Sequence, residues 1–97
     1  MLGIRDLVLV ITESVREGKN YLTERVGAEN IVQTTHERVF TESTEYKLIR
    51  LDEFDMHVQG TKIAKAIILD VELTPEQLHF LEGRFAGHQP DIETVEL

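Results

Sequence analysis

The stretch IAKAIILDVELTPEQLHFL, residues 63–81, decides the fold, because it joins the most hydrophobic strand of the chain to its clearest helix start. Its first half alternates large apolar residues along one face and places Ala64, Ala66 and Ile68 on the other. Strands that are apolar on both faces are typical of the interior of a sheet that is covered on both sides. We therefore expect a central strand over residues 63–73.

The second half of this stretch carries a helix start. Thr74 can cap the first turn, Pro75 suits the first helical position, and Gln77 completes a capping box. The pattern predicts an α-helix from Pro75 to Ala86 that is ended by Gly87. We expect three of its residues to face the core: Leu78, Leu81 and Phe85.

Upstream, apolar residues recur at three- and four-residue steps from Ile4 to Val26, which is the spacing of one face of a helix. This stripe predicts an N-terminal helix ended by Gly27. Gly18 lies within it and leaves an alternative, in which one helix ends near Glu17 and a second begins beyond the glycine. The stripe keeps its phase across Gly18, so we favour one continuous helix.

The middle of the chain reads as strands over residues 31–40, 46–51 and 54–59, with polar turns at residues 41–45 and around Gly60. Neighbouring strands without helices between them are typical of an antiparallel sheet, with the helices packed outside it.

The expected architecture is a single α+β domain over residues 1–97. It has an N-terminal helix, a three- to four-stranded mainly antiparallel sheet, and a C-terminal helix packed on one face. Residues 88–97 are expected to form a flexible or partner-contacting tail.

Composition excludes several functions. Eighteen acidic residues stand against ten basic ones, for a net charge of −8, and the bases are scattered. Direct nucleic-acid binding needs clustered Lys and Arg, so we expect none. The chain has no cysteine, which removes thiolate metal sites and a Cys nucleophile. Its longest apolar runs are too short for a membrane span, and we expect a cytoplasmic protein.

The stretch LDEFDMHVQG, residues 51–60, raises the question of a metal site. On a strand, Glu53, Asp55 and His57 would share one face, and two carboxylates with a histidine are suitable ligands. Ligands in a straight row about 7 Å apart converge poorly on one ion, however. We favour a solvated strand face, with a bulge or tight connection at Asp52 and Glu53, where the parity of the apolar positions changes.

The tetrapeptide EGKN, residues 17–20, resembles the end of a phosphate-binding loop. Glu13 stands where that motif has its first glycine, and Asn20 replaces the Ser or Thr that holds magnesium. With no strand expected before it, we interpret this stretch as helix. Neither serine of the chain lies in a G-x-S-x-G motif.

These exclusions favour a non-enzymatic protein-interaction or assembly subunit, without a cofactor or metal, that self-associates within a larger viral or other complex. The segment QTTHER, residues 33–38, is polar on both faces, as an edge strand or contact surface would be. The residues expected at contacts are Leu7 and Ile11 of the N-terminal stripe and Thr34, Thr35, His36, Glu37 and Arg38.

Two alternatives stay open. An acidic inhibitor could bind the basic, nucleic-acid-binding surface of a target protein, as the sign of the net charge suggests. A small metal-dependent or acid–base enzyme could use Asp55 and His57.

Overall fold

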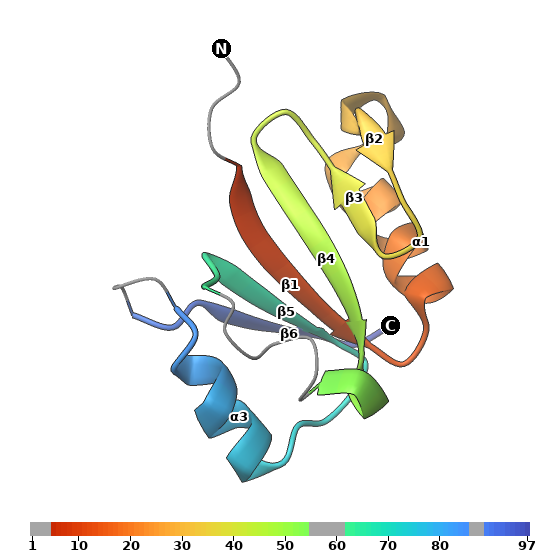
Figure 1. Cartoon of the computed structure of the whole chain (residues 1–97). Coiled ribbons are helices and arrows are strands. Elements are labelled where there is room, and N and C mark those ends of the chain that lie inside the picture. Colours follow the sequence, from red (N-terminus) through yellow and green to blue (C-terminus); the bar gives the residue numbers. More distant parts are fainter. Residues whose placement is uncertain (1–4, 55–61, 86–88) are drawn as a thin grey trace.

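The computed structural model describes residues 5–54, 62–85 and 89–97 (Figure 1). Its elements follow one another as β1 (Asp6–Thr12), α1 (Val15–Val26), the 3₁₀ turn η1 (Ala28–Asn30), β2 (Gln33–Thr34), β3 (Arg38–Phe40), β4 (Thr44–Arg50), the 3₁₀ turn η2 (Leu51–Glu53), β5 (Lys65–Leu69), α3 (Pro75–Glu82) and β6 (Ile92–Val95).

Within the described residues the strands form one six-stranded mixed sheet in the order β2-β3-β4-β1-β5-β6. β1 runs parallel to both β4 and β5, and β6 runs parallel to β5. β2, β3 and β4 are antiparallel. The protein is therefore a mixed α+β domain, but the expected three to four mainly antiparallel strands are corrected to six strands with a parallel centre.

The central strand β1 lies in a stretch that we expected to be helical. Leu9, Val10 and Ile11 are fully buried, and Val10 lies in register with Leu48 on one side and Ile67 on the other. A run of apolar residues buried on both faces is the pattern of a parallel strand. The same run also fits helical spacing, and periodicity does not separate the two for short apolar runs.

The expected continuous helix from Ile4 to Val26 is therefore wrong, and α1 begins only at Val15. Ser14 caps it, with its Oγ accepting the backbone N–H of Glu17 at 3.4 Å. Gly27 ends it as expected, in a conformation with φ of 87° that favours glycine.

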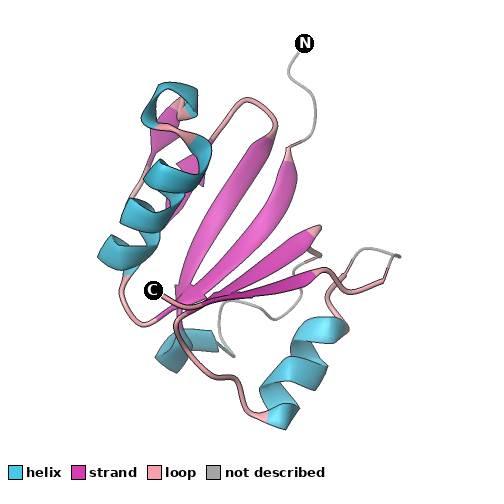
Figure 2. Ribbon diagram, turned by 180° about the vertical axis from the view of Figure 1, so that it is seen from behind, coloured by secondary structure: helices cyan, strands magenta, loops and turns pink. Residues whose placement is uncertain are grey.

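The core of the described residues divides between the two faces of the sheet. On one face Val8 and Val10 of β1 pack with Leu22 of α1, which lies in front of the β2–β3 end of the sheet in Figure 2. On the other face Leu9 and Ile11 pack with Leu81 of α3. β5 is buried along nearly its whole length, so an interior strand covered on both sides is confirmed, but it spans Lys65–Leu69 rather than residues 63–73.

The expected strand over residues 31–40 is instead a short hairpin. β2 and β3 pair with each other, and the backbone N–H of Thr35 donates to the carbonyl of Arg38 at 2.9 Å. The expected tight connection at Asp52 and Glu53 is confirmed, since both lie in η2. The strand expected next, over residues 54–59, lies outside the described residues except for Phe54, which is buried.

The capping box before α3 is confirmed in full. The Oγ1 of Thr74 accepts the backbone N–H of Gln77 at 3.1 Å, and the Gln77 side chain accepts the Thr74 N–H at 2.9 Å. The helix ends at Glu82, with Gly83 as its cap, rather than at Ala86.

The side chains of α3 divide between core and solvent. Leu81 is buried as expected, and so is Phe85 just beyond the end of the helix, but Leu78 is 36% exposed. Further along, the segment that we expected to be a tail contains β6, which pairs with β5 over residues 92–95. The end of the described chain is thus part of the sheet.

Gly18 marks a close approach of α1 to the sheet. A Cβ atom there would lie 2.3 Å from Cδ2 of Leu48 and 3.4 Å from Cγ2 of Thr12. Leu48 is itself buried in the core, so its side chain has little room to move aside. The glycine therefore has a packing role.

We predict that Gly18→Ala destabilises the protein. Alanine favours helix over glycine by about 1 kcal/mol, but overpacking a core costs about 1–3 kcal/mol, so the free energy of unfolding should fall. Asn20→Ala, at an exposed position on the same helix, is the control and should be neutral or stabilising. Urea unfolding of both variants measures this, and a stabilised Gly18→Ala would contradict the packing role.

Candidate functional site

A crevice of about 500 Å³ lies at the carboxyl ends of β1 and β4. Chain connections diverge here, because β1 leads to α1 over one face while β4 leads through η2 to Phe54 in the core of the other. In open sheets with parallel strands, ligands bind at such a point. The crevice is lined by Glu13, Ser14, Val15, His36, Glu37, Leu48, Arg50 and Glu53.

Charge at the crevice is predominantly negative. Among the described residues that line it, Arg50 is the one Lys or Arg. Its Nε lies 3.6 Å from Oδ1 of Asp52, and its guanidinium also pairs with Glu53. Glu13 and Glu37 add further carboxylates to the lining. Because like charges repel, this lining disfavours a phosphate group.

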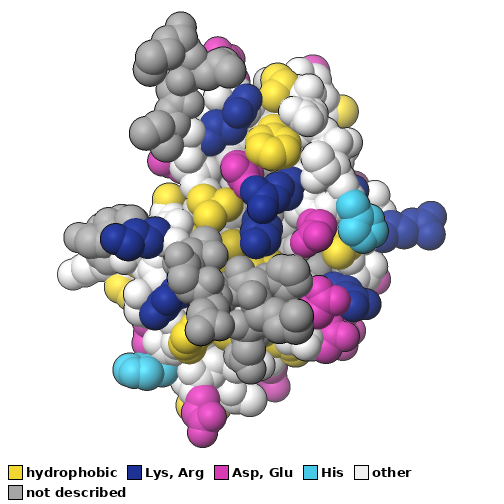
Figure 3. All heavy atoms as spheres, in the orientation of Figure 1, with side chains coloured by type: hydrophobic (Ala, Val, Ile, Leu, Met, Phe, Trp, Pro, Cys, Tyr) yellow, Lys and Arg dark blue, Asp and Glu magenta, His cyan; other side chains and the backbone are white. Residues whose placement is uncertain are grey.

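The acidic character continues along the carboxyl edge of the sheet. The hollows beside the crevice are lined by further carboxylates: Asp52, Asp70, Glu72 and Glu96. On the face shown in Figure 3, by contrast, acidic and basic side chains are interspersed. Carboxylates thus gather along the carboxyl edge.

The EGKN stretch does not form a phosphate cradle. A strand does precede it, which corrects our expectation, but only Glu13 and Ser14 separate β1 from α1. Gly18 and Lys19 lie within the helix, and Gly18 faces Leu48. A phosphate loop instead wraps a run of backbone N–H groups around its ligand before the helix begins.

The expected contact residues of the hairpin lie at one edge of the sheet. Thr34, Thr35 and His36 are exposed, whereas Glu37 and Arg38 are half-buried. The carbonyl of Glu37 accepts the backbone N–H of Leu48, and Arg38 pairs with Glu45. His36 and Glu37 also line the crevice, so the hairpin joins the edge of the sheet to it.

The two expected contact residues of the N-terminal stripe belong to the protomer's own core. Ile11 is fully buried, and Leu7 packs against the same cluster on the α3 face. Because the part of the stripe that contains them is β1, a strand inside the sheet, neither residue is presented to a partner. The expectation that Leu7 and Ile11 lie at a contact is therefore corrected.

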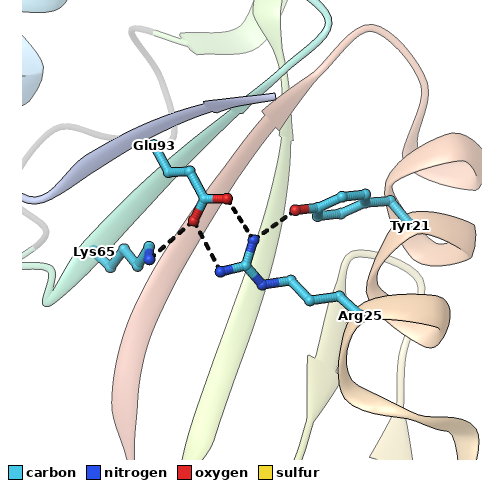
Figure 4. Close-up of polar contacts among 4 residues, drawn as sticks. All are labelled: Tyr21, Arg25, Lys65 and Glu93. Atoms are coloured by element: carbon cyan, nitrogen blue, oxygen red, sulfur yellow. Dashed lines mark hydrogen bonds and ion pairs between the residues drawn. The ribbon is translucent and has the colours of Figure 1, made fainter. Parts of the chain in front are cut away.

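A polar cluster that the sequence did not indicate joins α1 to β6 (Figure 4). The Glu93 carboxylate accepts hydrogen bonds from the two terminal guanidinium nitrogens of Arg25, each at 2.8 Å. It also forms an ion pair with the Nζ of Lys65 at 3.0 Å. Arg25 also donates to the hydroxyl of Tyr21 at 2.6 Å. These residues come from distant parts of the chain, so no sequence spacing could have identified them.

The cluster holds Glu93 ionised. Hydrogen bonds from Arg25 and then Lys65 lower the pKa of Glu93 to about 2. A carboxylate whose pKa is depressed on folding stabilises the native state above its unfolded pKa, near 4.5, and loses that contribution as the pH falls towards 2.

We predict that Glu93→Gln lowers the free energy of unfolding at pH 7 by about 1 kcal/mol, the upper range for partly exposed ion pairs. The difference from the wild type should shrink as the pH falls from 4.5 towards 2. Urea unfolding over this pH range measures it. Glu96→Gln, at an exposed position on the same chain end, is the control, and an equal loss there would contradict the assigned role of Glu93.

Metal ligands do not gather in the described residues, where no group of three or more His, Cys, Asp or Glu side chains is placed to hold an ion. Asp55 and His57, the pair in our enzyme alternative, lie outside these residues. No helix in the described part of the chain is long and apolar enough to cross a membrane.

Comparison with known proteins yields a likeness of fold. No family model and no curated protein matches the chain. A solved structure of the large terminase from the thermophilic bacteriophage D6E, in complex with ADP, is similar with a TM-score of 0.60 and 12% sequence identity. The match covers 97% of this chain and 26% of that one. At this identity the likeness shows the fold alone.

Proposed function

We propose that this chain is a non-enzymatic protein-interaction subunit that self-associates within a larger assembly in the cytoplasm. The observation that carries the proposal is the hairpin edge, which we define as residues 32–36. β2 ends the sheet on this side, and Val32 is 59% exposed. An edge strand offers unpaired backbone groups to a second chain.

The hairpin edge suits pairing with a copy of itself. Gln33, Thr34 and Thr35 are uncharged, and Arg38 beside them is already paired with Glu45. Two copies brought together here would not oppose like charges, and each could cover the other's Val32. Because β2 has only two residues, the contact is small. We therefore expect the fraction of associated chains to rise over the micromolar concentration range.

A second candidate function rests on the acidic carboxyl edge of the sheet, which favours a basic partner. This is the inhibitor alternative, in which carboxylates contact the basic surface of a target protein. Screening by salt weakens exposed charge contacts, so binding of this kind would be lost at high ionic strength.

Nucleotide binding is the main rival, since the similar terminase structure contains ADP. The acidic crevice and the two-residue connection between β1 and α1 both argue against it here. A phage setting for the proposed assembly agrees with the source of that terminase, but the proposal itself depends on the edges of the sheet.

We predict that ADP and ATP, with magnesium, do not stabilise the protein. A nucleotide at a concentration of 100 Kd would add about 2.7 kcal/mol, which is several degrees in Tm. Thermal unfolding with about 1 mM nucleotide should show no such shift. A stabilisation that Arg50→Ala removes would place a nucleotide in the crevice and overturn the non-enzymatic proposal.

We predict that Val32→Arg weakens self-association by about tenfold or more, because it places two like charges in the paired edge. Light scattering after size exclusion, from about 5 to about 200 μM, should show the wild-type mass rising with concentration. Leu97→Arg, which changes another exposed apolar residue, should leave it unchanged. A wild type that stays monomeric throughout, or an equal effect of both variants, would contradict the proposal.

A further inference from the structure

The opposite edge of the sheet, β6, also has unpaired backbone groups. The carbonyls of Asp91 and Val95 accept the backbone N–H groups of Ala66 in β5 and of Asp70 just after it, at 2.9 and 2.7 Å. Successive residues of a strand point their backbone groups in alternate directions, so those of Ile92 and Thr94 face away from β5. No strand in the described part of the chain lies on that side.

An apolar groove of about 400 Å³ runs beside this edge, between β6 and α3. Leu78 lines it and is 36% exposed, although it lies on a helix whose Leu81 is fully buried. The apolar lining residues are Ile68, Val71, Leu73, Leu78 and Ile92. A strand added to β6 would direct every second side chain towards this groove.

The β6 edge is held in place from its other face. The Glu93 side chain is tied there to Arg25 and Lys65, which fixes the strand against α1 and β5. Glu93 is thus already neutralised and does not compete for a ligand at the groove. An edge that is ordered before binding loses less entropy when a partner is added.

Charge decides what occupies this edge. Glu72 and Glu82 line the groove, and Glu96 lies at the carboxyl end of the strand. A second copy of this chain would bring the same carboxylates against them, and like charges juxtaposed at an interface cost several kcal/mol. Basic side chains would instead complement them.

We propose that the β6 edge and its groove bind an extended segment of a partner protein that presents both apolar and basic side chains to the groove. The segment adds a strand beside β6, pairing its backbone with Ile92 and Thr94. Among its side chains that point to the groove, the apolar ones lie beside Leu78 and the basic ones approach Glu72 and Glu82, while the side chains between them point to the other face of the sheet. This site is separate from the hairpin edge, so it stands or falls independently of self-association.

The test is binding of a fluorescein-labelled peptide to the full chain, followed by anisotropy; threonine alternates in this peptide with valine and lysine taken in turn, so that one face of the strand carries both valine and lysine. A peptide of the same composition with its residues in separate blocks, and one with glutamate in place of lysine, are the controls. We expect the alternating basic peptide to bind at least about tenfold more tightly than either. Binding that is equal for the alternating and block peptides would overturn strand addition.

Backbone pairing is tested with a matched pair of variants. Thr94→Pro removes an outward N–H at an edge position where proline is tolerated, and should weaken binding by about tenfold or more. Thr94→Val keeps the N–H and the branched shape, and should leave the affinity within about twofold. Circular dichroism establishes that both are folded. Unchanged binding by a folded Thr94→Pro would refute the proposal.

Charge is tested with two variants of equal net charge. Glu72→Lys with Glu82→Lys should weaken binding by about tenfold or more at low salt, whereas Glu24→Lys with Glu42→Lys, at exposed positions elsewhere, should have little effect. Equal losses in both would show that only net charge attracts the peptide, and would overturn the proposal. The proposal would also be overturned if the wild type formed a dimer that Thr94→Pro abolished, since a second copy of the chain would then occupy β6.

Discussion

Burial of β1 on both of its faces is the constraint on which the rest of the structure depends. Leu9 and Ile11 pack towards α3 while Val8 and Val10 pack towards α1, so this strand must lie inside the sheet with a layer on each side. β4 and β5 both run parallel to it. A parallel neighbour requires a crossover connection over one face of the sheet, which supplies a layer that covers the strand. α1 lies in the connection from β1 to β4 and packs on one face of the sheet. Gly18 then lets α1 approach Leu48 closely.

A centre built in this way leaves the functional possibilities at the margins of the sheet. The carboxyl edge carries the crevice, but its carboxylates and its short β1–α1 connection make it a poor place for phosphate. The two lateral edges differ in charge. The hairpin edge is nearly neutral and suits a second copy, whereas β6 lies beside Glu72 and Glu82 and suits a basic segment. One subunit with two such edges could join unlike partners in an assembly.

Local signals were readable from the sequence, and non-local ones were not. The capping box at Thr74, the helix stop at Gly27 and the two-sided burial of β5 depend on neighbouring residues, and all three are confirmed. β1 was misassigned because a five-residue apolar run fits a buried strand and a helical stripe equally well. A helical interpretation of this run leaves no strand that could pair in parallel with β4 and β5.

The candidate site was predictable only in part, for the same reason. The polar composition of residues 33–38 indicated an edge, and those residues do lie at one. The Arg25–Glu93 pair joins residues 68 positions apart, and only the fold brings them together. The role of Gly18 is similar, since a glycine required by close packing looks in the sequence like a helix breaker or part of a phosphate loop.

We propose that this protein works through the edges of its sheet, and amide NMR spectra recorded on dilution and on addition of a basic extended peptide test this. We expect dilution to shift signals of residues 32–36 and the peptide to slow hydrogen exchange at Ile92 and Thr94. Signals that stay unchanged at both edges, with changes confined to Glu13, Ser14 and Arg50, would contradict it and make the crevice the functional site.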